Sequence, residues 1–182
     1  RRGAGFGADS LKLQGQVAVN SGVTTTADML YGTHSFEEEW DDHSKAITDG
    51  SLPLRMFLVP FEGALRRRYG ENFLDFYEHM AAQATDRLAV HGVKFVNDGS
   101  YPSMTLRLNY PGYLDGEEGL TGEVPWEDMV DRMLPFWKEG IQIHSHANGD
   151  ETIDMTLNTL KALQNAAPRF DHRFTIEHYC IS

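Results

Sequence analysis

Short apolar segments alternate with longer amphipathic segments along most of this chain, and this alternation constrains the fold more than any other feature. The apolar segments predict strands at residues 23–29, 54–59, 93–97, 141–146 and 174–179. The segments between them predict helices at residues 35–48, 71–91, 125–139 and 150–166. Strands that alternate with helices of this length imply parallel pairing through right-handed crossovers, so the sequence predicts an α/β fold.

Two α/β architectures are compatible with this pattern: a doubly wound five-stranded sheet, or part of a (β/α)8 TIM barrel. The length of 182 residues by itself favours the doubly wound sheet, because complete barrels have about 250 residues. The chain shows no internal repeat or linker. We therefore expect residues 1–182 to form a single domain.

Two local signals refine the predicted elements. Ser35 is suited to the N-cap of the helix at residues 35–48, and Glu38 completes a capping-box pattern with it. Residues 100–124 are rich in Gly, Pro and Tyr and show no regular period. A loop of this length inside a domain predicts a functional segment, and an ordinary surface loop is the alternative.

The charge of the chain limits the partners that it can bind. Its 16 Lys and Arg against 27 Asp and Glu give a formal net charge of −11. This balance argues against a broad nucleic-acid surface and against a polybasic membrane contact, so we expect a small-molecule partner. No apolar run is long enough to span a bilayer, and no apolar signal core follows the first residues, which predicts a cytoplasmic protein. The single cysteine, Cys180, is expected to be a buried apolar residue.

Polar side chains gather at the carboxyl ends of the last three predicted strands, where parallel α/β folds place their functional groups. Lys94 and Asp98 belong to the first of these strand ends, His144 and His146 to the second, and His178 to the third. Because neutral imidazole is a preferred ligand of Zn²⁺ and similar divalent ions, this cluster indicates a metal site.

Each of these residues also has a structural interpretation. Lys94 could pair with Asp98 at the strand end, and His144 could be a packed, hydrogen-bonded histidine. Asp150 is expected first to cap its helix. Glu177 alternates with His178 along the strand, so we expect it to point away from that histidine and to be structural.

Four segments of the chain resemble the amidohydrolase superfamily, and within it amidohydrolase family 3, which includes the N-substituted formamide deformylases. They are residues 22–28, 93–100, 144–150 and 172–178. The segment His-Ala-Asn-Gly-Asp at residues 146–150 and the Arg-x-x-x-Glu-His pattern at residues 173–178 are its most specific parts. The resemblance identifies these segments with strands two, four, five and six of the family's barrel, so it implies a partial TIM barrel of strands two to six.

The resemblance also implies site residues. Lys94, which is often carboxylated in this superfamily, His146 and His178 would be metal ligands, and the cofactor would be one or two divalent ions, with Zn²⁺ favoured. We further expect His144, Asp98 and Tyr101 to contact the substrate. The family's first-strand His-x-His pair has no counterpart before Gly22, and the general-base aspartate of the eighth strand is expected outside this chain.

These implications define the predicted function and its alternatives. The parent protein would be a metal-dependent hydrolase of carbon–nitrogen bonds other than peptide bonds, and the residues present here would be inactive by themselves. A non-catalytic binding or regulatory barrel module is the alternative, since a fold does not dictate a function. An oxidoreductase on an open sheet is a third reading, but no glycine-rich nucleotide loop follows the first strand. Open sheet edges predict a homo-oligomer.

Overall fold

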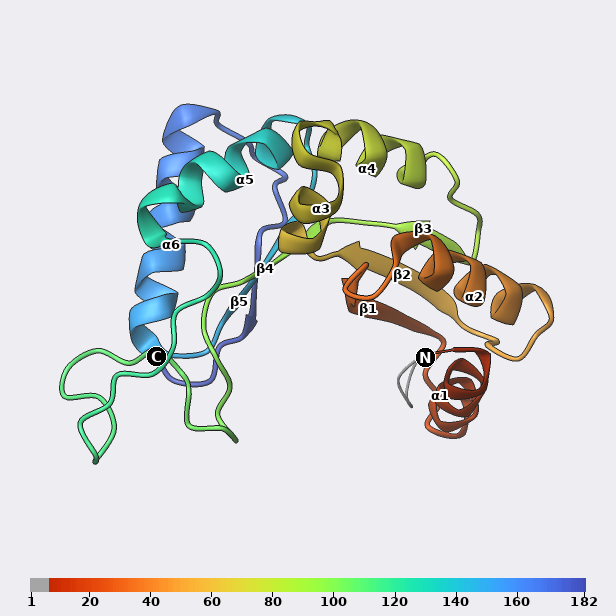
Figure 1. Cartoon of the computed structure of the whole chain (residues 1–182), viewed down its shortest axis with the longest axis horizontal. Coiled ribbons are helices and arrows are strands. Elements are labelled where there is room, and N and C mark those ends of the chain that lie inside the picture. The colour runs from red at the N-terminus through yellow and green to blue at the C-terminus, as the bar shows by residue number, and fades with distance from the viewer. Residues whose placement is uncertain (1–6) are drawn as a thin grey trace. The chain divides into compact units, whose positions relative to one another are not determined.

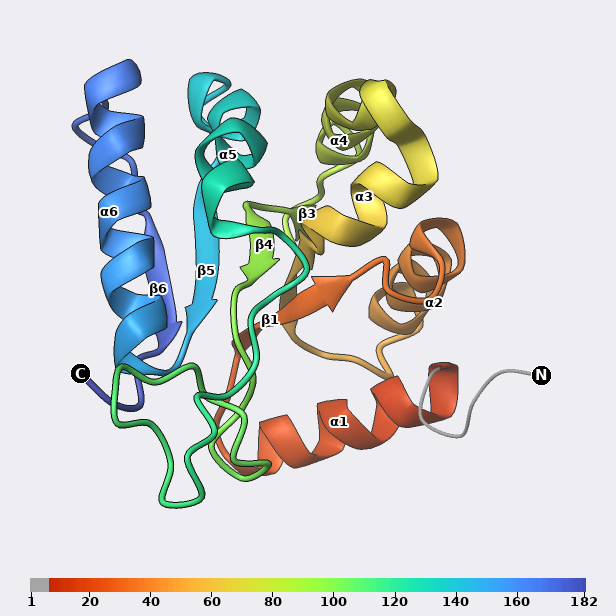
Figure 2. The same cartoon turned by 60° about the vertical axis from the view of Figure 1, so that its left-hand side comes forward.

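The computed structural model describes residues 7–182, which form two compact units (Figures 1 and 2). One unit ends at His91 and the other spans Gly92–Ser182. The strands are β1 (Thr25–Tyr31), β2 (Arg55–Pro60), β3 (Leu88–Val90), β4 (Val93–Val96), β5 (Ile143–Ala147) and β6 (Thr175–His178). The α-helices are α1 (Ala8–Asn20), α2 (Phe36–Thr48), α3 (Glu62–Tyr69), α4 (Phe73–Ala81), α5 (Met129–Lys138) and α6 (Asp150–Ala166), and 3-10 turns cover Gly70–Asn72 and Trp126–Asp128.

The unit that ends at His91 is built on a parallel sheet in the order β1–β2–β3. Leu58 of β2 and Leu65 of α3 are fully buried in its core. Tyr31 at the end of β1 is also buried, and its hydroxyl donates to the Phe36 carbonyl at 2.7 Å. This bond joins the end of β1 to the first residue of α2, so it fixes the turn between the two elements.

The start of α2 confirms the predicted N-cap and changes its details. The Ser35 hydroxyl accepts a hydrogen bond from the Glu38 N–H at 3.3 Å, as the capping pattern predicts. The reciprocal acceptor is Glu39, whose carboxylate receives the N–H groups of Ser35, His34 and Gly32 at 2.7–2.9 Å. Glu39 belongs to the helix, but its carboxylate binds the backbone of the preceding turn. It therefore holds the β1–α2 connection in place.

The predicted helix at residues 71–91 is wrong beyond Ala81. Leu88 and Val90 are buried on β3, which pairs in parallel with β2, with Phe57 opposite Ala89. The apolar residues that have helical spacing over this range therefore belong partly to a helix and partly to a strand. Pairing with β2 decides the outcome, because a buried strand satisfies its backbone groups through its neighbour.

The sequence patterns also missed two helices, α1 and α3. Helix α3 includes the basic run Arg66, Arg67 and Arg68. Arg66 bonds the buried Glu62 at 2.6 Å, one helical turn earlier, and its guanidinium lies 4.1 Å from the centre of the Phe73 ring. These contacts give the charged face of α3 specific partners.

The unit that spans Gly92–Ser182 has a second parallel sheet, in the order β4–β5–β6. Helices α5 and α6 lie side by side along its strands (Figure 2). Phe95 of β4 and Phe136 of α5 are both buried and meet edge to face, with ring centroids 6.1 Å apart. Ile143 of β5 and Leu163 of α6 are buried too, so the core lies between this sheet and its helices.

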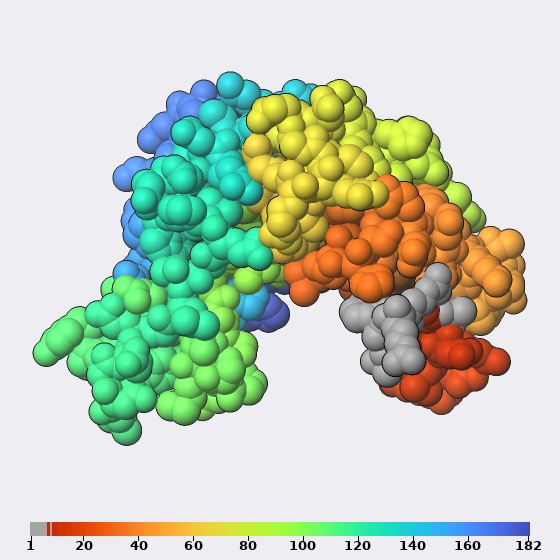
Figure 3. All heavy atoms as spheres, in the orientation of Figure 1, coloured from red at the N-terminus to blue at the C-terminus, as the bar shows by residue number. Residues whose placement is uncertain are grey.

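Residues 97–125 connect β4 to the 3-10 turn before α5 without a helix or an extended strand, and they include the loop that the sequence predicts at residues 100–124. In the space-filling view, part of this segment protrudes from the rest of its unit (Figure 3). Arg107 anchors the segment through ion pairs to Glu118 at 2.7 Å and to Glu151 on α6 at 2.6 Å. The loop is therefore tied to the end of the sheet where α6 begins.

The α/β class and the parallel pairing expected from the sequence are confirmed, and the two sheets are consistent with a partial barrel. The structure divides the chain at His91, within a stretch that the sequence assigns to one helix and one strand. No helix among residues 7–182 is both long enough and apolar enough to cross a membrane.

Candidate metal site at the ends of β4, β5 and β6

The strand register brings four polar side chains to one face of the β4–β5–β6 sheet. Lys94 pairs with His144, and His146 pairs with Glu177 on the next strand. Residues directly opposite one another on neighbouring strands point to the same face, and residues two apart on one strand share that face. The opposite face carries Ser145, whose hydroxyl accepts from the Asn97 amide at 2.6 Å. The predicted clustering of Lys94, His144 and His146 is therefore found.

Lys94 is the most enclosed member of this face, with an exposed fraction of 3%. Burial lowers the pKa of its ammonium group, and the nearby charge of Glu177 opposes that shift in part. The alternative pairing of Lys94 with Asp98 is not found, since the contacts of the Asp98 carboxylate are with other groups. Among the described residues, Lys94 has no hydrogen bond or ion pair through its side chain, so its amine is available for another role.

The ring of His146 is held by one of its two nitrogens. Its Nε2 lies 2.8 Å from the Gly99 carbonyl oxygen, 3.3 Å from Asp98 Oδ1 and 2.9 Å from Asn148 Nδ2. Two of these three neighbours, the Gly99 carbonyl and the Asp98 carboxylate, can only accept a proton, so we assign the proton of the neutral ring to Nε2. This assignment leaves Nδ1 with its lone pair, and within the described part of the chain Nδ1 has no hydrogen-bond partner.

His178 reaches the same cluster from the end of β6. Its ring centroid lies 4.6 Å from that of His146, with the two rings edge to face. Burial lowers the pKa of His178, and the nearby His146 and Lys94 lower it further. The neutral imidazole that a metal requires is thus favoured.

The expectation that Glu177 points away from His178 is corrected by this geometry, and its structural role stays a prediction. Glu177 lies on the face of His144 and accepts at 2.8 Å from its Nδ1, or pairs with it when the ring is charged. His178 has a positive φ of 76°, so the strand alternation ends at this residue and its ring approaches His146. Both side chains therefore approach one face.

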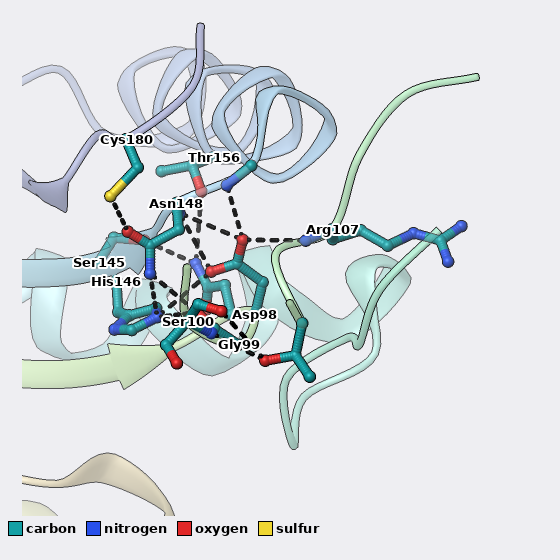
Figure 4. Close-up of polar contacts among 12 residues, drawn as sticks. Asp98, Gly99, Ser100, Arg107, Ser145, His146, Asn148, Thr156 and Cys180 are labelled. Atoms are coloured by element: carbon teal, nitrogen blue, oxygen red, sulfur yellow. Dashed lines mark hydrogen bonds and ion pairs between the residues drawn. The ribbon is translucent and has the colours of Figure 1, made fainter. Parts of the chain in front are cut away.

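Asp98 was expected to contact the substrate, but its side chain is fully buried. Its carboxylate accepts the backbone N–H groups of Gly149 at 2.8 Å, Asn148 at 3.1 Å and Arg107 at 3.3 Å (Figure 4). Burial by itself raises the pKa of Asp98, but its hydrogen bonds from His146 and from these N–H groups outweigh that effect and lower it. Asp98 therefore orders the turn after β5 and supports His146.

The remaining two predicted substrate contacts differ in their placement. His144 lies two residues before His146, packed so closely on Gly92 that a Cβ there would be 2.8 Å from the ring. Its Nε2 is buried without a hydrogen-bond partner among the described residues. Tyr101 lies in a turn of the long loop and is 67% exposed. A substrate contact for either residue stays a prediction.

Sequence reasoning did not find the roles of Asn148, Gly99 and Cys180. Asn148 is buried, and its side-chain amide donates to the Gly99 carbonyl at 2.8 Å. Cys180 was expected to be buried, but it is exposed and its thiol donates to Asn148 Oδ1 at 2.9 Å. These contacts join residues far apart in the sequence, and only the Asn in the 146–150 segment offered a signal.

The donor set can be tested against a divalent ion. Two imidazoles lie ring to ring, and the buried amine of Lys94, which has no hydrogen bond within the described residues, lies on the same face. Among residues 7–182, no group of three or more His, Cys, Asp or Glu side chains is arranged to hold a metal. The residues therefore fit part of a metal site, with the lysine as the third group.

Solved structures similar to this chain define the class of its fold. An uncharacterized metal-dependent hydrolase from Pyrococcus horikoshii OT3 matches with a TM-score of 0.67 and 19% identity, over 88% of this chain and 32% of that one. An uncharacterized metal-dependent hydrolase from Pyrococcus furiosus matches with a TM-score of 0.68 and 18% identity, over 89% and 33%. The chain thus spans about a third of the length of these hydrolases, and it shares their fold over that part.

The sequence itself gives the family. The model of the amidohydrolase family matches residues 8–182, almost the whole chain, so the chain belongs to that family. No curated protein matches it.

Proposed function

We propose that this chain is part of a metal-dependent hydrolase that cleaves carbon–nitrogen bonds other than peptide bonds, such as amide, N-formyl or cyclic amide bonds. The observation that carries this proposal is the meeting of His146, His178 and the buried Lys94 at one end of a parallel sheet. Membership of the amidohydrolase family supports the reaction class. A cytoplasmic location belongs to the same proposal.

In this proposal, His146 would bind the ion through Nδ1 and His178 through a ring nitrogen. Zn²⁺ is favoured because two of the three donors are imidazoles. Lys94 would bind after carboxylation, in which its neutral amine attacks CO₂, forms a carbamate and releases one proton. Its burial favours the neutral amine that this step requires. The number of ions, one or two, belongs to the same proposal.

When bound, a divalent ion supplies acidified water and polarises the substrate carbonyl. The residues of this chain hold the site for that chemistry. Asp98 and Gly99 accept the Nε2 proton of His146 and keep its ring oriented. Tyr101 and its loop would cover the substrate, and His144 would hold Glu177 beside Lys94.

The two carboxylates near the cluster are already engaged. Asp98 is buried among N–H donors, and Glu177 is bonded to His144. A general base therefore has to come from another part of the enzyme. We expect residues 1–182 by themselves to bind metal without hydrolysing substrate.

Elemental analysis tests this proposal. We expect the purified protein, loaded with Zn²⁺ and then dialysed, to retain the metal in stoichiometric amount, and His146→Ala or His178→Ala to lose it. The exposed His79 on α4 provides the matched control, because His79→Ala removes an imidazole far from the cluster in sequence and outside its unit. Retention of Zn²⁺ by both cluster variants would contradict the proposed site.

A folded wild-type protein that retains no Zn²⁺ would instead favour a non-catalytic binding module. Intact mass measured under native conditions adds a separate readout, because carboxylation increases the mass of Lys94 by one CO₂. Loss of that increment in Lys94→Arg would assign the modification to this residue.

A further inference from the structure

Asn148, in the turn between β5 and α6, uses both its backbone and its side-chain polar groups (Figure 4). Its backbone N–H donates to the Asp98 carboxylate at 3.1 Å, and its carbonyl accepts from the Ile181 N–H at 3.0 Å. Its side-chain amide donates to the Gly99 carbonyl at 2.8 Å, and its Oδ1 accepts from the Cys180 thiol at 2.9 Å. Both ends of the side chain are thus held, and Asn148 is only 3% exposed.

The partners of Asn148 come from three different strand ends. Asp98 and Gly99 follow β4, Asn148 itself follows β5, and Cys180 and Ile181 follow β6. We call these five residues the Asn148 network. It therefore ties together the carboxyl ends of all three strands of this sheet.

The network is most important for the position of β6. Ladder pairing between β5 and β6 ends with Ala147 opposite His178. His178 and Tyr179 then both have positive φ values, 76° and 52°, so the chain leaves strand geometry at the point where His178 extends its ring. Beyond this point, the bonds from Cys180 and Ile181 to Asn148 hold the chain to the end of β5.

The three strands that the network joins carry one proposed metal ligand each: Lys94 on β4, His146 on β5 and His178 on β6. The Gly99 carbonyl also accepts from both Asn148 and His146, so the network includes a group that orients a ligand ring. We propose that Asn148 is a positioning residue, which sets the separation of these three ligands through its bonds to Gly99 and Cys180. This inference rests on the proposed function.

A Co²⁺ titration followed by visible absorption tests the proposal. We expect Asn148→Ala to bind Co²⁺ about 10- to 100-fold more weakly than wild type, the range found when groups that support metal ligands are removed. Cys180→Ala, which removes only the side-chain link to the end of β6, should also bind more weakly. Cys180→Ser keeps a hydroxyl donor and should restore affinity, which a general packing role would not predict.

Ile181→Ala is the matched control. It lies next to Cys180, and its contact with Asn148 is through the backbone, so the network remains. The melting temperature of each variant is measured in parallel, so that loss of affinity is separated from loss of folding. If Asn148→Ala does not fold, Cys180→Ala and its Ser rescue decide the outcome.

A second readout needs no metal. In the metal-free protein, we expect NMR cross-relaxation between the ring protons of His146 and His178, whose centroids lie 4.6 Å apart. It should weaken in Asn148→Ala and Cys180→Ala and persist in Cys180→Ser. Wild-type Co²⁺ affinity together with unchanged cross-relaxation in both Ala variants would overturn the positioning role. A wild-type protein that binds no Co²⁺ would count against the proposed function, and the cross-relaxation alone would then decide the role of Asn148.

Discussion

The imidazole rings of His146 and His178 meet edge to face across neighbouring strands, with their centroids 4.6 Å apart. The two residues are 32 positions apart in sequence, and each strand contributes one of them. Parallel pairing aligns the strand ends, and the positive φ of His178 redirects its side chain toward His146. The proposed metal site depends on both features.

The phenol of Tyr69 gives a prediction for alkaline pH. Burial, followed by its hydrogen bond to Glu37 at 2.9 Å, raises the pKa of Tyr69 from 10.0 to about 12. Because the folded pKa is raised, the contribution of Tyr69 to stability is fully present below about pH 10 and is lost as the pH rises toward 12. We expect the free energy of unfolding of wild type, measured in urea, to fall more steeply over this interval than that of Tyr69→Phe.

Tyr101→Phe is the control for this experiment, because Tyr101 is largely exposed. It should leave the slope as in wild type. Equal slopes for wild type and Tyr69→Phe would show that the phenol titrates alike in the folded and unfolded states.

Gly149 gives a prediction about the cost of adding a side chain where the backbone of another segment is in contact. It has ordinary extended backbone angles, with φ −85° and ψ 155°, but a Cβ here would collide with the backbone of Arg107. We expect Gly149→Ala to destabilise the protein by about 2–3 kcal/mol, as overpacking does when backbone has to move.

Gly140 is the comparison for Gly149, because a side chain there would meet no other atoms and would change only the backbone conformational energy. It has a positive φ of 77°, with open space around the position of a Cβ. Gly140→Ala should therefore cost only about 1 kcal/mol, for the left-handed backbone. Urea unfolding of both variants measures the difference in their free energies of unfolding. An equal loss in the two variants would mean that the backbone around Arg107 moves away from the added methyl group at little energetic cost.

Arg169 gives a prediction about the end of α5. Its guanidinium donates to the carbonyls of Trp137, Gly140 and Ile141 at 2.8–3.2 Å and lies 4.8 Å from the centre of the Trp137 ring. A lysine ammonium cannot reproduce this planar set of donors. We expect Arg169→Lys to lower the free energy of unfolding by about 1–2 kcal/mol.

Arg173→Lys is the comparison for Arg169→Lys. Arg173 pairs with Asp171 at 2.9 Å, but both side chains are about two-thirds exposed. Such a pair contributes little, so the change should stay within about 0.5 kcal/mol. A loss as large as that of Arg169→Lys would contradict this ranking of the two arginines.

The edge of β1 gives a prediction about association. Within its sheet, β1 pairs only with β2, and a cavity of about 500 Å³ beside it is lined by Leu11, Ala27 and Met29 among others. We propose that this open edge pairs with a second copy of the chain, and we expect light scattering after gel filtration to find dimers or larger species.

Ala27→Pro tests this edge directly. Thr24 accepts from Arg55 of β2, so alternate residues of β1 bond β2 and the N–H of Ala27 points to the open side. Proline there removes an edge donor without removing a bond to β2. We expect the variant to be monomeric, and a monomeric wild type at all concentrations would rule out pairing through the edge.

Helix α6 shows how much local sequence can determine. Its predicted range, 150–166, agrees with the structure, because the apolar spacing marks its buried face; its N-cap, however, is Gly149, and Asp150 is the first residue of the helix. The strands around Lys94 and His146 were found for a similar reason, since β-branched and apolar runs are bounded by Gly and Asp. The candidate ligands followed from these ranges together with the family resemblance.

Other features depended on contacts between segments far apart in the chain. Leu88–Val90 has the spacing of a helix and becomes β3 because β2 is beside it. Glu177 was expected to point away from the side of His178, but it bonds His144 because β5 and β6 pair in one register. Such outcomes are decided by partners that a local pattern does not contain.

The sequence by itself therefore determined the α/β class, most strands, the last helix and the residue types of the site. Periodicity, caps and donor chemistry are local properties, so they can be read from neighbouring residues. Tertiary structure alone decided that Asp98 is buried, that His146 keeps Nδ1 free, and that Asn148 joins three strand ends. Burial and hydrogen bonding are properties of the assembled sheet, because each partner lies on a different strand or loop.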